Sequence, residues 1–60
     1  MNERWIWAEN LPLFAEMVKK ERGYVHVYDS AQLEEGELIV HVEYDRCNTI
    51  EYESRRIKKN

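Results

Sequence analysis

The chain has 60 residues, of which 43% are hydrophobic and 35% charged, and its formal net charge at pH 7 is −3. A domain of this size buries only about 60% of the surface that its unfolded chain exposes, so the sequence predicts one small domain, residues 1–60, without room for a large enclosed cavity. A single cysteine excludes an internal disulfide and a zinc site made of cysteines alone.

The sequence contains no run of about 18 consecutive apolar residues, and its first residues do not follow the basic-then-apolar order of a signal peptide. The lone Cys47 suits a reducing compartment. The composition therefore predicts a cytoplasmic protein that does not bind a membrane.

Residues 1–9 form an aromatic N-terminal arm that contains Trp5 and Trp7. In an extended segment the two tryptophans lie on one side, as in an additional strand, whereas a helical turn would separate them. The sequence leaves both alternatives open.

Residues 10–22 are predicted to form an amphipathic helix. Asn10 is a good N-cap, Pro12 suits the first turn, and Gly23 is a natural stop. Leu11, Phe14 and Val18 follow at spacings of three and four, which places them in one apolar stripe.

Beyond Gly23 the hydrophobic period changes to two, which predicts strands at 24–28, 38–44 and 49–53. Residues 29–36 form a polar connection and residues 45–48 a turn. We therefore expect an α+β fold in which the helix packs on a three-stranded antiparallel β-meander (24–57), followed by a basic tail (55–60).

The alternation also assigns the two faces of this sheet. The face that the helix covers is expected to hold Val25, Val27, Leu38, Val40, Val42, Ile50 and Tyr52. The opposite face is expected to hold Tyr24, His26, Tyr28, Ile39, His41, Glu43, Thr49, Glu51 and Glu53. Only the N-terminal arm remains to cover this second face, so we expect function there.

The sequence gives little support for catalysis. His26 and His41 project from the same face, but their spacing is not a recognised metal-ligand pattern. An open sheet offers no cleft that would separate the environments of two carboxylates, and Asp45 does not activate Cys47. The two glycines form no phosphate-binding loop. We expect no catalytic residue, no metal and no cofactor.

Acidic residues dominate the segment 29–54. Neighbouring strands would bring Glu43, Glu51 and Glu53 close together, where they would steer a basic partner. In size and in its helix-plus-meander layout, the chain resembles small phage-encoded inhibitors that mimic DNA. This resemblance implies acidic-face mimicry against a host protein as an alternative function.

The last residues are basic and suggest a second alternative. Arg55, Arg56, Lys58 and Lys59 would bind the phosphates of a nucleic acid with strong dependence on salt. The acidic sheet would repel a nucleic acid strand that crossed it. A solubilising terminus is the simpler interpretation of this tail.

The aromatic residues outside the expected core favour protein binding. Large exposed aromatics in a small domain mark an interaction surface, and here they are Trp5, Trp7, Tyr24 and Tyr28. The other possibility is that the arm folds over the open face as a second small core. We expect a non-enzymatic regulator or inhibitor that binds another protein, with Glu43, Glu51 and Glu53 as further contacts, and that forms a homodimer to supplement its small core.

Overall fold

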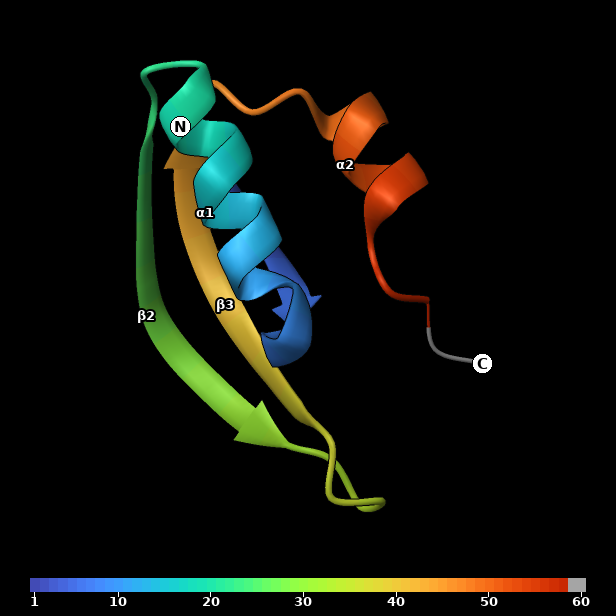
Figure 1. Ribbon diagram of the computed structural model, residues 1–60. Coiled ribbons are helices and arrows are strands. Elements are labelled where there is room, and N and C mark those ends of the chain that lie inside the picture. Colours follow the sequence, from blue (N-terminus) through green and yellow to red (C-terminus); the bar gives the residue numbers. More distant parts are fainter. Residues whose placement is uncertain (59–60) are drawn as a thin grey trace.

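A computed structural model describes residues 1–58, in which a three-stranded antiparallel sheet carries a helix on one face (Figure 1). The strands are β1 (Asn2–Trp7), β2 (Tyr24–Gln32) and β3 (Leu38–Asp45), and β3 lies between the other two. The predicted α+β class, with a helix on a three-stranded antiparallel sheet, is confirmed.

The elements around the sheet are short. A 3₁₀ turn, η1 (Ala8–Asn10), connects β1 to the helix α1 (Leu11–Lys20), and a second helix, α2 (Thr49–Arg55), follows β3. In Figure 1, α1 lies in front of the sheet and α2 lies beside it.

The third strand comes from the N-terminus and not from residues 49–53. β1 runs antiparallel to β3, with Asn2 opposite Tyr44 and Trp7 opposite Ile39. The prediction of a meander over 24–57 is therefore wrong in its last strand. The aromatic arm is the strand that pairs with the second edge of β3. The backbone groups of β3 are therefore hydrogen-bonded on both sides, to β1 and to β2.

Residues 49–55 form a helix because their first turn is capped. The side-chain oxygen of Asn48 accepts a hydrogen bond from the backbone N–H of Glu51 at 3.0 Å. Tyr52 is then buried at 1% exposure, whereas Ile50 is 84% exposed. Two residues that would share a face of a strand lie on different sides of a helix, so the expected core position of Ile50 is wrong.

Helix α1 lies within the predicted range, and it buries Phe14, Met17 and Val18 against the sheet. After the helix, the left-handed conformation falls on Arg22 (φ 56°) and not on Gly23. Gly23 is required for a different reason, since a Cβ atom there would lie 2.3 Å from the carbonyl oxygen of Asp45. The stop therefore also allows close contact between this turn and the end of β3.

Strand β2 is longer than predicted. It continues to Gln32 through a β-bulge between Val27 and Asp29, so much of the expected polar connection 29–36 belongs to the strand. The bulge adds one residue without ending the pairing with β3, and alternation beyond it changes phase. The hairpin turn is correspondingly short, and Gly36 supplies its positive φ of 86°.

The core lies between α1, the sheet and α2. Its buried hydrophobic members are Ile6, Phe14, Met17, Val18, Val40, Val42, Tyr44 and Tyr52. Phe14 is fully buried and meets the rings of Tyr44 and Tyr52 edge to face at centroid distances of 4.9 and 5.0 Å. Val27 and Leu38, which were expected here, are exposed because they lie on the edge strand and near the hairpin turn.

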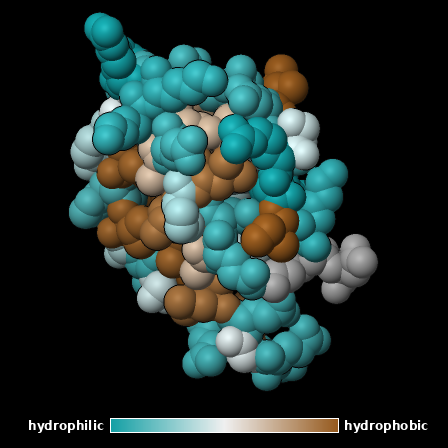
Figure 2. Space-filling view, viewed as in Figure 1, coloured by the Kyte–Doolittle hydropathy of each residue, from teal (hydrophilic) through white to brown (hydrophobic). Residues whose placement is uncertain are grey.

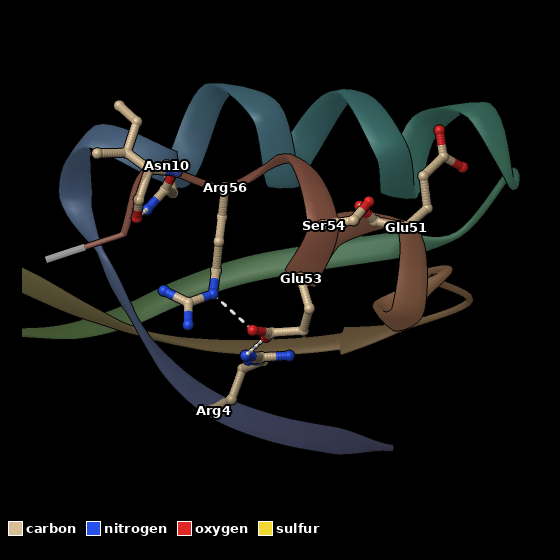
Figure 3. Close-up of polar contacts among 7 residues, drawn as sticks. Arg4, Asn10, Glu51, Glu53, Ser54 and Arg56 are labelled. Atoms are coloured by element: carbon tan, nitrogen blue, oxygen red, sulfur yellow. Dashed lines mark hydrogen bonds and ion pairs between the residues drawn. The ribbon is translucent and has the colours of Figure 1, made fainter.

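Asn10 connects the two ends of the chain. Although it precedes α1 as predicted, its side chain does not cap that helix. Its amide donates a hydrogen bond to the carbonyl oxygen of Ile57 at 3.1 Å and accepts one from the N–H of Ile57 at 2.8 Å. A buried side-chain amide thus pairs with both backbone groups of one residue and holds the segment after α2 beside η1 (Figure 3).

Candidate functional site

One face of the sheet is covered by α1, and within residues 1–58 no helix packs against the other (Figure 1). We call this second face the open face. The strand register and ring contacts place on it Glu3, Trp5, Trp7, Tyr24, His26, Tyr28, Asp29, Ala31, Ile39, His41, Glu43 and Asp45. Figure 2 shows the side of the molecule that carries α1, where hydrophobic side chains gather in the middle of a mostly hydrophilic surface.

Four aromatic rings cross the open face from one edge of the sheet to the other, and we call them the aromatic row. Trp5 on β1 stacks on His41 of β3, with a centroid distance of 4.6 Å and an interplanar angle of 17°. Tyr28 on β2 contacts the same imidazole at 4.4 Å, and His26 lies 6.3 Å from Tyr28. The row therefore joins all three strands.

The backbone places these rings together. Trp5 is directly opposite His41 in the antiparallel register, and cross-strand neighbours on one face lie about 5 Å apart. On the other side of β3 it is Asp29 that aligns with His41, because the bulge inserts Tyr28 as an extra residue. The Tyr28 ring thereby reaches the central imidazole without displacing Asp29.

Hydrogen bonds fix the centre of the row. The Tyr28 hydroxyl donates to the carboxylate of Glu3 and lies 3.0 Å from Nε2 of His41. The hydrogen bond to Glu3, together with desolvation and the carboxylate charge, raises the pKa of Tyr28 to about 12. Tyr28 therefore remains a neutral hydrogen-bond donor throughout the physiological pH range.

The predicted aromatic contacts are partly brought together. Trp5 and Tyr28 are each 43% exposed and meet through His41, while Trp7 is half-buried two residues along the same face. Tyr24 lies at the far end of the sheet, opposite Asp45. The sequence placed His41 on this face but did not identify it as the ring that links the others, because its two partners come from distant segments.

The predicted acidic cluster does not form. Glu43 lies on the open face opposite Glu3 and His26, but Glu51 and Glu53 belong to α2. The expected array of carboxylates on adjacent strands is therefore wrong, and with it the layout behind the DNA-mimicry alternative. That array required residues 49–53 to be a strand.

Glu53 instead forms an ion-pair link between α2 and β1. Its carboxylate accepts hydrogen bonds from Arg4 and Arg56 (Figure 3). The hydrogen bond from Arg4, supported by Arg56, lowers the pKa of Glu53 despite partial desolvation. The guanidinium of Arg4 also lies over the ring of Tyr52 at 5.1 Å.

The basic tail is partly occupied by contacts within the chain. Arg55 pairs with Glu51 at 3.6 Å and Arg56 pairs with Glu53, while Asn10 holds the backbone of Ile57. Lys58 is exposed, and Lys59 lies outside the described residues. These contacts reduce the positive charge that Arg55 and Arg56 offer to a phosphate backbone.

The other candidates for chemistry are not assembled into a site. Within residues 1–58, no group of three or more His, Cys, Asp or Glu side chains is arranged to hold a metal ion. Burial raises the pKa of the Cys47 thiol, which disfavours the reactive thiolate. A hollow of about 370 Å³ beside β1 is lined by Trp5, Trp7 and Ile39 among others, and not by either histidine.

Comparison with known proteins gives no assignment. No protein-family model matches this sequence, and searches of curated proteins and of solved structures find no match. In the part of the chain that the structure describes, neither helix has the length and apolar character needed to cross a membrane.

Proposed function

We propose that this chain is a non-enzymatic protein-interaction module, a small regulator or inhibitor that binds another protein through the open face. The observation that carries the proposal is the aromatic row, which is half-exposed on a sheet face that no described helix covers. The proposal places the protein in the cytoplasm, since the single half-buried thiol suits a reducing compartment.

An antiparallel sheet commonly has one solvated face, and its outward positions are then mostly polar. Here Trp5 and Tyr28 occupy such positions, and tryptophan and tyrosine dominate the binding energy of many protein interfaces. Stacking and the hydrogen bonds of Tyr28 hold the rings in place before binding, which lowers the entropy that binding must overcome.

The proposal includes self-association through the edge of β2. This edge strand has nine residues, of which only Val25 is not exposed. An antiparallel contact between two β2 edges would extend the sheet across a two-fold axis and supplement a small core. Sedimentation equilibrium over a wide range of concentrations tests this. We expect a dimer. A monomer at every concentration would contradict self-association.

The test of the main proposal is capture of a partner from a native cell extract at low and high salt. We expect the wild-type domain to retain one defined protein at high salt, and Trp5→Ala to retain at least tenfold less, because truncating a hot-spot aromatic costs on the order of 2 kcal/mol of binding energy. Ile50→Ala is the matched control, since it also truncates an exposed apolar side chain, but on α2.

Two results would contradict the proposal. One is equal retention of the protein by wild type and Trp5→Ala. The other is recovery of nucleic acid alone, bound only at low salt and lost in Arg55→Gln with Lys58→Gln, two exposed bases of the tail, which would assign binding to the tail.

A further inference from the structure

The open face is acidic as well as aromatic. Its strand positions carry four carboxylates, and within residues 1–58 the register places no lysine or arginine among them. These acids are Glu3, Asp29, Glu43 and Asp45. Arg4, the one base in β1, lies on the opposite face and binds Glu53.

Two of these acids oppose each other directly. Glu3 of β1 is the cross-strand partner of Glu43 of β3, and like charges at such positions destabilise a sheet. This pair lies two positions along the strands from the pair of Trp5 and His41, on the same face. A cation bound between them would remove this repulsion, so binding of a positive group is favoured over binding of a neutral one.

The aromatic row adds a second attraction for the same kind of group. A guanidinium lies favourably over the face of tryptophan or tyrosine, and its planar donors also pair with carboxylates in a fixed geometry. Trp5 and Tyr28 are both half-exposed, and Tyr28 directly contacts Glu3. His41 covers one face of Trp5, but both rings keep exposed aromatic surface beside the carboxylates, so one ligand can contact both.

Charge also argues against the other occupants of this face. A nucleic acid can stack on aromatic rings, but its phosphates would be repelled by the carboxylates. A second copy placed face to face would set the same four acids against their equivalents. A partner with positive charge is the occupant that this surface complements.

We propose that the open face binds a cationic segment of its partner, in which arginine side chains contact the exposed parts of Trp5 and Tyr28 and pair with Glu3 and Glu43. This inference rests on the function proposed above and names the chemistry of the partner. Beyond the row, Trp7 and Ile39 extend the surface with apolar contacts.

The test uses defined peptides and the intact domain. The probe is a capped seven-residue peptide of alternating serine and arginine, compared with the same peptide carrying lysine, glutamine or glutamate in place of arginine. Amide and indole chemical shifts of the ¹⁵N-labelled domain report both affinity and location, and the indole N–H groups of Trp5 and Trp7 are direct reporters.

We expect saturable binding of the arginine peptide with shifts confined to the open face. The lysine peptide should bind several-fold more weakly, and the glutamine peptide at least tenfold more weakly, which corresponds to about 1.4 kcal/mol or more. The double variant Glu3→Gln with Glu43→Gln should lose at least tenfold in affinity for the arginine peptide. Its matched control is Glu34→Gln with Glu35→Gln, which makes the same charge change in the exposed hairpin turn.

The inference fails if the glutamine peptide binds as tightly as the arginine peptide, or if both double variants weaken binding equally. It also fails if no peptide shifts the open-face signals at millimolar concentration, or if the shifts lie on α2. Loss of the captured partner in Trp5→Ala, together with any of these results, would leave the protein-binding function intact and remove only the cationic partner.

Discussion

The two faces of the sheet use similar side chains in opposite ways. On the covered face, Phe14, Tyr44 and Tyr52 meet edge to face and are buried. On the open face, Trp5 stacks on His41, Tyr28 contacts the same imidazole at a tilt, and both remain 43% exposed. Aromatic content alone therefore does not distinguish a core from a binding surface.

The difference between the faces lies in what surrounds the rings. The covered face is closed by α1 and α2, and the polar groups at its border are paired through Asn10 and Glu53. The open face retains opposed carboxylates and a tyrosine bound to one of them. If this comparison is correct, substitutions on the covered face affect folding, and substitutions on the open face affect binding.

The largest effect is expected for Phe14→Ala. Removing a fully buried phenylalanine costs about 3–5 kcal/mol, which is comparable to the whole stability that a core of this size supplies. We expect the variant to be largely unfolded at 25 °C by circular dichroism. Leu38→Ala is the control, since Leu38 is 47% exposed. A cooperative urea transition within about 1 kcal/mol of wild type would contradict the assigned core.

Asn10→Ala should cost about 2 kcal/mol, because two hydrogen bonds to the backbone N–H and C=O of Ile57 are lost in a buried setting. We expect faster hydrogen exchange of the Ile57 amide together with a lower urea midpoint. Asn48→Ala, which removes the cap of α2, provides the comparison and should cost about 1 kcal/mol without exposing the Ile57 amide to the same degree. An unchanged exchange rate at Ile57 would show that Asn10 does not hold this segment.

Trp5→Ala should lower the free energy of unfolding by only about 1–1.5 kcal/mol, since it removes one ring stack and leaves the covered face intact. Urea denaturation measures this loss beside that of Phe14→Ala. A loss as large as that of Phe14→Ala would mean that the open face is a second core, and would remove the distinction between the two faces.

The smallest effect is expected for Glu53→Gln, at about 0.5–1 kcal/mol at pH 7, because the ion pairs with Arg4 and Arg56 are partly exposed. The folded state lowers the pKa of Glu53, so this stabilisation is present above the unfolded-state pKa of about 4.3 and is lost as the pH falls through the lower folded-state value. Thermal unfolding should show the variant approaching wild type once the pH falls below the folded-state pKa of Glu53. Glu35→Gln is the exposed control, and a difference that persists at low pH would show that charge is not its cause.

The helical part of the fold shows how much local pattern predicts. The stripe of Leu11, Phe14 and Val18 and the stop at Gly23 indicated α1, and the structure places it within the expected range. The same method failed for residues 49–53, where alternation over five residues is too short to separate strand from helix. The useful indication there was Asn48 followed three residues later by Glu51, a pattern typical of a helix start.

The candidate site was predictable in its members and not in its assembly. Alternation placed Trp5 and Trp7 on one side of an extended arm and His41 on the open face, but it did not indicate that the arm pairs with β3. The bulge at Val27 and Asp29 that brings Tyr28 to His41 has no clear mark in the sequence. The ion pair between Glu53 and Arg4 could not be predicted, since the two residues are 49 positions apart in the chain.

The sequence by itself determined the segments with a strong local period, namely α1, the first half of β2 and β3, because neighbours in the chain decide which side chains share a face. Only the tertiary structure decided which segment pairs with the second edge of β3, and where the Asn10 amide and Tyr52 ring are buried. These outcomes depend on hydrogen bonds and burial between distant residues. Such contacts between distant residues stabilise the fold only when the whole domain has assembled.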